Sequence, residues 1–162
     1  MIADTTFLKD VASYVSSETS SQIPWGVMLM QGTTDAGAML PTAGNVNRLI
    51  GICTYSAATQ VNTEMGSVAD AAGRIGILPG VQFGVSRRGR LWVQVEEAVT
   101  TASPVRIRNT VAGNGTGTFR TTSAGAGLSM LLTGCRYLDT AVANGICRVE
   151  FDMLLRNQFT AD

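Results

Sequence analysis

The sequence predicts an all-β fold: a single-domain β-sandwich or jelly-roll-like structure with an N-terminal arm or short helix. Three observations carry this prediction. Short apolar runs recur along the chain, glycine-rich turn signals separate them, and the clearest runs alternate apolar and polar residues with a period of two. Many short strands with strong turn signals and little helix are typical of sandwiches, jelly rolls and small barrels.

The N-terminal segment differs in pattern from the rest of the chain. Apolar residues between Leu8 and Val15 follow the i, i+3, i+4 and i+7 spacing of one helix face, and a polar stretch follows over residues 16–21. We therefore divide the 162 residues into an N-terminal arm or connector at 1–22 and a single β domain at 23–162. An arm that docks on a neighbour and a frayed terminus both fit this segment.

From residue 23 onward the apolar runs predict strands. They cover residues 25–30, 48–55, 81–86, 90–96, 105–108 and 147–153. The last run is the clearest, because every odd position from 147 to 153 is apolar and every even position between them is charged. A shift of one residue in the pairing would therefore bury three charges. Residues 56–74 suggest a loop or short helix, and residues 110–129 suggest a hairpin or wide loop.

Composition excludes several classes of function. The chain has no histidine, which rules out Ser-His-Asp, Cys-His and His-containing zinc sites. Its formal net charge is zero, which gives no general attraction to nucleic acid or to an anionic membrane. Cys53, Cys135 and Cys147 show no metal-site spacing and predict buried, reduced thiols in a reducing compartment such as a bacterial cytosol.

The remaining chemical motifs favour a protein without catalytic residues, metal or cofactor. Glu96-Glu97 and the pair Glu150 and Asp152 are the only carboxylate clusters of interest, and a glycosidase that uses carboxylates alone is the one enzymatic alternative. The glycine-rich residues 113–117 lack the Lys-Ser/Thr and the helix of a phosphate-binding loop.

Two features on neighbouring positions are candidate contact sites. Arg87, Arg88 and Arg90 surround Gly89, and we expect them at the tip of a turn between two strands, either solvated or binding carboxylates or phosphates of a partner. Trp92 alternates with the apolar face of its strand, so it points outward. It is then either an interface anchor or a side chain covered by a loop or the N-terminal arm.

The order of four stretches resembles the structural cement, or head decoration, proteins of tailed bacteriophages. They are residues 18–27, 49–53, 89–95 with 104–107, and 136–151. Each stretch is ordinary strand-and-turn sequence, and the resemblance lies in their order and spacing. It spans about residues 18–153 and leaves out the first 17.

The resemblance implies a virion structural protein on the outer surface of an icosahedral head, assembled in the host cytoplasm. There it would bind the major capsid protein, bridge neighbouring subunits of the expanded shell, and associate with itself as a homodimer or homotrimer. Residues expected at the capsid or oligomer interface are Phe7, Leu8, Val11, Trp25, Arg87, Arg88, Arg90 and Trp92. The alternative is a carbohydrate- or receptor-binding β-domain on a phage surface.

Overall fold

The computed structural model describes residues 10–42, 48–54, 76–109, 115–153 and 159–161, and every regular element within them is a β-strand. The all-β prediction is therefore confirmed. The strands are β1 (Asp10–Ser16), β2 (Ile23–Pro24), β3 (Met28–Gln31), β4 (Gly37–Met39), β5 (Leu49–Thr54), β6 (Gly76–Ile77), β7 (Gln82–Gln94), β8 (Arg106–Arg108), β9 (Phe119–Arg120), β10 (Ser129–Leu132), β11 (Arg136–Tyr137), β12 (Ile146–Asp152) and β13 (Phe159–Ala161).

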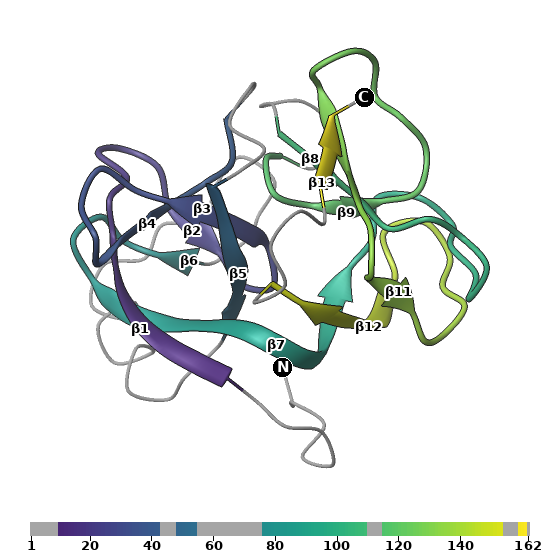
Figure 1. The fold of residues 1–162 in the computed structure, drawn as a ribbon, viewed down its shortest axis with the longest axis horizontal. Helices are drawn as coiled ribbons and strands as arrows, with labels where there is room; N and C mark the ends of the chain where they lie inside the picture. Colours follow the sequence, from purple (N-terminus) through teal and green to yellow (C-terminus); the bar gives the residue numbers. More distant parts are fainter. Residues whose placement is uncertain (1–9, 43–47, 55–75, 110–114, 154–158, 162) are drawn as a thin grey trace.

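The N-terminal half forms a small closed barrel. Its strands follow the order β1-β4-β3-β5-β7, and the pairing of β1 with β7 closes the ring. In Figure 1 this barrel lies on the left, with β7 running along the bottom toward the other half. The barrel core consists of Ile23, Val27, Leu29, Ala38, Cys53, Ile77, Phe83 and Val85.

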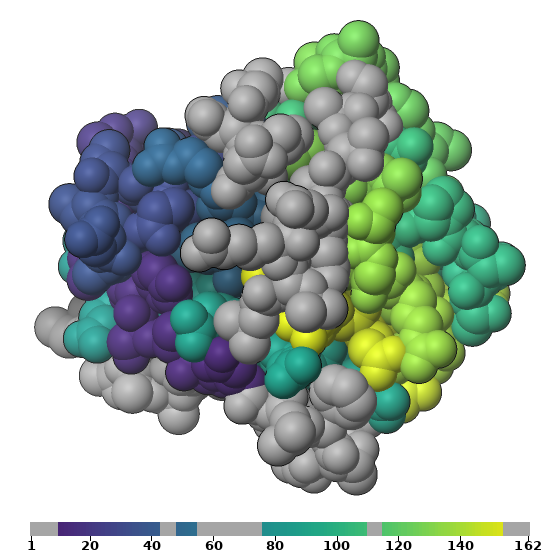
Figure 2. Space-filling view, viewed as in Figure 1, coloured from purple at the N-terminus to yellow at the C-terminus, as the bar shows by residue number. Residues whose placement is uncertain are grey.

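The C-terminal half is built on the far end of β7. There β12 pairs with β7 and β11 pairs with β12, while β13-β10-β8-β9 form a separate four-stranded sheet. Figure 2 shows the two halves side by side, purple and blue against green and yellow. Between the sheets lies a second cluster, the sandwich core, whose larger members include Phe119, Met130, Tyr137, Val149 and Phe151.

Strands β3 and β5 are buried on both faces, which explains their unbroken apolar sequences. Leu29 and Cys53 belong to the barrel core, whereas the alternating residues Met28, Met30 and Ile52 belong to the sandwich core. Successive side chains of a strand point to opposite faces, so a strand between two cores needs apolar residues at every position. The expected strands at 25–30 and 48–55 are thus confirmed with shifted bounds, at Met28–Gln31 and Leu49–Thr54.

The helix suggested by the spacing from Leu8 to Val15 is wrong for the part that the structure describes. Residues 10–16 form β1, which pairs in parallel with β4 and antiparallel with β7. Val11 and Val15 are exposed and the residues between them alternate in burial, a period of two. The apolar spacing is that of a helix, but backbone pairing with strands on both sides of β1 outweighs this local preference. Leu8 lies outside the described residues.

The turn expected at residues 87–90 is also wrong. β7 continues without a break from Gln82 to Gln94, with Gly89 paired opposite Phe151. The irregularity sits at Arg87, because Asp10 pairs with Arg88 while Val11 pairs with Ser86. Such a bulge bends a strand and re-aims its side chains. Gly89 has a φ of +136°, a backbone conformation that favours glycine, within a strand rather than at a chain reversal.

The later strand predictions are confirmed at β8 and β12. In β12, Cys147, Val149 and Phe151 are buried and the charged residues between them are partly exposed, as the alternation predicts. Residues 56–74 and 110–114 lie outside the described residues.

Burial raises the pKa of the Cys53 thiol well above its usual value, so this thiol is held protonated.

A buried ion network joins the residues just after β7 to strands β8 and β9. Arg120 is 8% exposed and pairs with both Glu96 and Glu97, while Arg108 pairs with Glu96 at 2.9 Å. Glu97 also accepts hydrogen bonds from the backbone amides of Thr121 and Thr122. The carboxylates that the sequence singled out at 96–97 are therefore part of a structural network.

We predict that Arg120→Met destabilises the protein by about 3 kcal/mol, because it leaves two largely buried carboxylates without their shared cation. The matched control is Arg136→Met, whose side chain is 65% exposed and should cost under about 1 kcal/mol. The free energy of unfolding from urea titration checks both. Equal losses would show that burial of the network adds nothing.

We also predict that Gly51→Ala destabilises the protein by about 2 kcal/mol more than Gly80→Ala, because overpacked sites typically cost about 1–3 kcal/mol. Both glycines have positive φ, but a Cβ at Gly51 would lie 2.2 Å from the carbonyl oxygen of Ser86, whereas a Cβ at Gly80 meets nothing within 4 Å. Thermal and urea unfolding of the two variants measure the difference. Indistinguishable stabilities would refute the close approach of β5 to β7.

Candidate interaction surface

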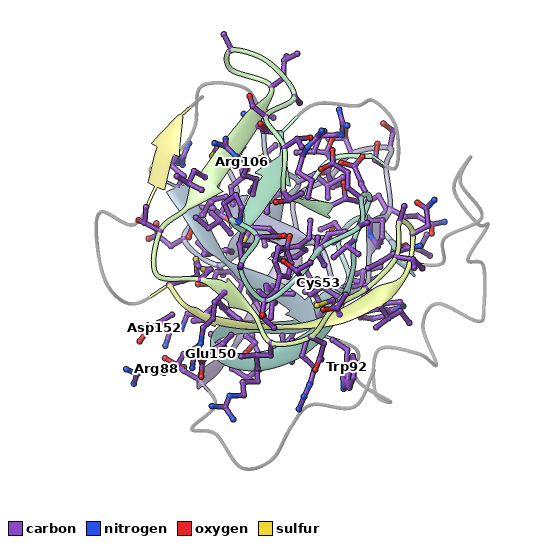
Figure 3. The ribbon with its side chains drawn as sticks, turned by 90° about the vertical axis from the view of Figure 1, so that its right-hand side faces the viewer. Cys53, Arg88, Trp92, Arg106, Glu150 and Asp152 are labelled. Atoms are coloured by element: carbon purple, nitrogen blue, oxygen red, sulfur yellow. The ribbon has the colours of Figure 1, made fainter. Side chains whose placement is uncertain are left out.

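The outer face of β7, β12 and β11 carries a set of paired polar side chains. Its side chains face one another across the strand pair, with Arg88 opposite Asp152, Arg90 opposite Glu150 and Trp92 opposite Arg148. In Figure 3 the labelled Arg88, Asp152, Glu150 and Trp92 all lie on the lower side of β7 and β12, away from the centre of the molecule.

Oppositely charged residues on this face form an ion-pair ladder: Arg88 with Asp152, and Arg90 and Arg136 with Glu150. The N···O distances are 2.8 Å for Arg88–Asp152 and 3.0 Å for Arg90–Glu150, and Arg136 closes on the other oxygen of Glu150. Opposite charges directly across a strand pair stabilise that register. The sequence left Arg88 and Arg90 either solvated or in contact with a partner, and in the structure they bind carboxylates of the same chain.

Arg87 is separated from the ladder by the bulge. Its guanidinium binds Asp10 of β1 at 2.7 Å and so ties the first strand of the barrel to the longest one. The hydrogen bond to Asp10 raises the pKa of Arg87. The bulge thus gives Arg87 an intramolecular partner different from those of Arg88 and Arg90.

Trp92 is half-buried and points outward, as predicted from its strand phase. The guanidinium of Arg148 lies over its ring, 5.5 Å from the centroid, and is itself held by two 2.8 Å hydrogen bonds to Asp139. A cation fixed over an indole ring is a favourable arrangement. Within the described residues, the cover on Trp92 is therefore Arg148 from the neighbouring strand.

The other expected interface residues do not join this face in one patch. Trp25 is half-buried against the barrel core, and Val11 is 53% exposed on the outer side of β1. Phe7 and Leu8 lie outside the described residues. The structure thus brings together Arg88, Arg90 and Trp92 from the expected set.

Sequence reasoning missed the turn between β11 and β12. Val142 and Ile146 are 75% and 65% exposed, the highest values among the large apolar side chains described. The signal was present, because Asn144-Gly145 is a strong turn dipeptide and apolar residues stand on both sides of it.

The electrostatics of the carboxylates do not favour acid–base chemistry. Desolvation alone would raise the pKa of Glu150, but hydrogen bonds from Arg136 and Arg90 outweigh it and lower the pKa. In Glu97, hydrogen bonds from Thr122 and Thr121 likewise outweigh desolvation and lower the pKa. A carboxyl general acid needs a raised pKa, so both shifts run against the glycosidase alternative.

No group of three or more Cys, Asp or Glu side chains in the described residues is placed to hold a metal ion. None of those residues belongs to a helix long and apolar enough to cross a membrane.

We predict that Glu150→Gln costs about 1 kcal/mol of stability at neutral pH, as expected for a partly buried ion pair. The pKa of Glu150 is lower in the folded chain than its unfolded value of about 4.3. The stability that the ionised Glu150 side chain contributes is therefore complete above that pH and is lost as pH falls through the folded pKa. The gap between variant and wild type should therefore shrink at low pH. Urea unfolding across the acid range tests this, and Asp35→Asn, at an exposed carboxylate, is the control.

Comparisons with known proteins agree with this architecture. The sequence matches the family described as structural cement protein (E217 gp24/Pam3 gp6) over residues 1–152, which includes the first 17 residues that the sequence resemblance left out. No curated protein matches the chain. The fold is similar to that of a chain in "The capsid of Myoviridae Phage XM1", with a TM-score of 0.66 and 14% identity, over 95% of this chain and 89% of that chain. At that identity the likeness concerns the fold alone, and it is the family match that places the protein: the chain belongs to the family of phage structural cement proteins.

Proposed function

We propose that this protein binds the outer surface of the expanded phage head, bridges neighbouring major capsid subunits and stabilises the shell. The observation that carries the proposal is the family match over residues 1–152. Membership in a structural cement family gives a role in the virion and association with the capsid shell. The bridging contact and the assembly of the virion in the host cytoplasm are the finer parts of the proposal.

The mechanism is stabilisation by mass action. A protein that binds only the expanded shell adds its binding free energy to that state. A Kd of about 1 μM corresponds to about 8 kcal/mol per site. Contacts to more than one subunit combine through effective concentration, so weak individual contacts become strong together.

The structure supports this role through preorganisation. The ion-pair ladder and the buried network around Arg120 hold the polar side chains in fixed positions before any partner arrives. A surface whose side chains are already ordered loses little conformational entropy on binding. Because its arginines have partners within the chain, the ladder face suits docking by shape more than long-range electrostatic steering.

Self-association as a homodimer or homotrimer remains part of the proposal. The outward Trp92 with its fixed Arg148 has the composition of an interface anchor, since Trp and Arg are enriched at energetically dominant contacts. Residues 1–9, with Phe7 and Leu8, remain a proposed docking arm. Removing residues 2–9 tests this arm without removing β1, which begins at Asp10.

The test is co-sedimentation of the purified protein with expanded, undecorated shells, against unexpanded shells and isolated capsid subunits. We expect saturable binding to expanded shells at least about tenfold tighter than to the other two, because only the expanded lattice presents neighbouring subunits at the right spacing. Equal affinity for isolated subunits and shells would contradict bridging. Absence of binding to either kind of shell would contradict the proposed function.

A further inference from the structure

The turn between β11 and β12 carries an exposed apolar knob, which we define as Val142, Ala143 and Ile146. All three side chains are exposed. In Figure 1 this turn belongs to the yellow-green connection at the right-hand side, between the arrows of β11 and β12. Turn tips in folded proteins are usually built from polar residues and glycine, so an apolar tip calls for a reason outside the fold.

The knob is held rigidly although it is exposed. The amide of Gly145 donates to the carbonyl of Val142 at 2.9 Å, and Asn144 adopts the left-handed φ of 61° that this turn needs. The end of β7 supports it from below, because the amide of Val95 donates to the carbonyl of Gly145 and the side chain of Gln94 donates to that of Asn144.

Along the pairing of β12 with β7, the residues between the knob and Arg148 are uncharged. Ile146 stands opposite Gln94 in the strand pairing, and the next pair on the same face is Arg148 opposite Trp92. Arg148 is the nearest charge along β12, and Asp139 already neutralises it through two hydrogen bonds. A matching surface therefore needs no counter-charge, and a charged one would lose its hydration without gaining a partner.

We infer that this knob inserts into an uncharged, apolar recess on the capsid subunit. The inference rests on the proposed function and adds to it the point of contact. The exposed tip of a turn is convex, and a two-fold contact between copies of this chain would bring two convex tips together over little area. A recess on a different protein fits it better, with Trp92 and Arg148 at the rim.

The experiment compares two double variants of the full chain in the shell co-sedimentation assay. Val142→Ser/Ile146→Thr removes the apolar knob. Val15→Thr/Leu128→Ser makes comparable changes at two other exposed apolar side chains, neither of them among the expected interface residues, and is the control. The knob variant should bind expanded shells at least about tenfold more weakly than wild type, since each buried apolar side chain contributes substantially to binding. The control should bind within about twofold of wild type.

Two further readouts separate the outcomes. Urea unfolding should show that the knob variant is as stable as wild type, since its changes are on exposed side chains. Light scattering reports the oligomeric state. If the wild type binds shells and the knob variant binds them equally well, the contact role of the knob is wrong and the proposed function stands. The same holds if the knob variant loses self-association but keeps its shell affinity. Failure of the wild type to bind shells would overturn the proposed function itself.

Discussion

Strand β7 is the element on which both halves of the structure depend. Its first part pairs with β1 and β5 and closes the barrel, and its last part pairs with β12 and carries the sandwich. Phe83 and Val85 lie in the barrel core, whereas Leu91 and Val93 lie in the sandwich core. The backbone of β7 thus forms hydrogen bonds with strands of both halves. The bulge at Arg87 lies where its partners change from barrel strands to sandwich strands.

Charge in this protein is used mainly to fix its own geometry. The chain is lightly charged, and its best-placed arginines bind carboxylates across strands or in the buried network around Arg120. Exposed pairs of this kind contribute little stability, but they specify register and hold side chains in place. A partner approaching this face meets a surface that is already neutralised and ordered.

These properties suit a protein that reinforces a lattice by adding many small contacts. Rigid features such as the turn at Asn144 lose little conformational entropy on docking. Salt weakens binding through apolar contacts less than it weakens binding through ion pairs. The total stabilisation by such a protein is the sum over many binding sites on the shell, so no single contact with one subunit has to be strong.

The sequence by itself determined the all-β class, the strands at β8 and β12, the outward phase of Trp92 and the resemblance to phage cement proteins. Alternation with a period of two is a local property, so it survives whatever the strands pair with. The strand conformation of residues 10–16, the unbroken path of β7 through Gly89 and the internal partners of Arg87, Arg88 and Arg90 were decided only by the tertiary structure. The local pattern pointed to a helix at the first of these sites and to a turn at the second, and pairing with strands distant in the sequence outweighs such local preferences.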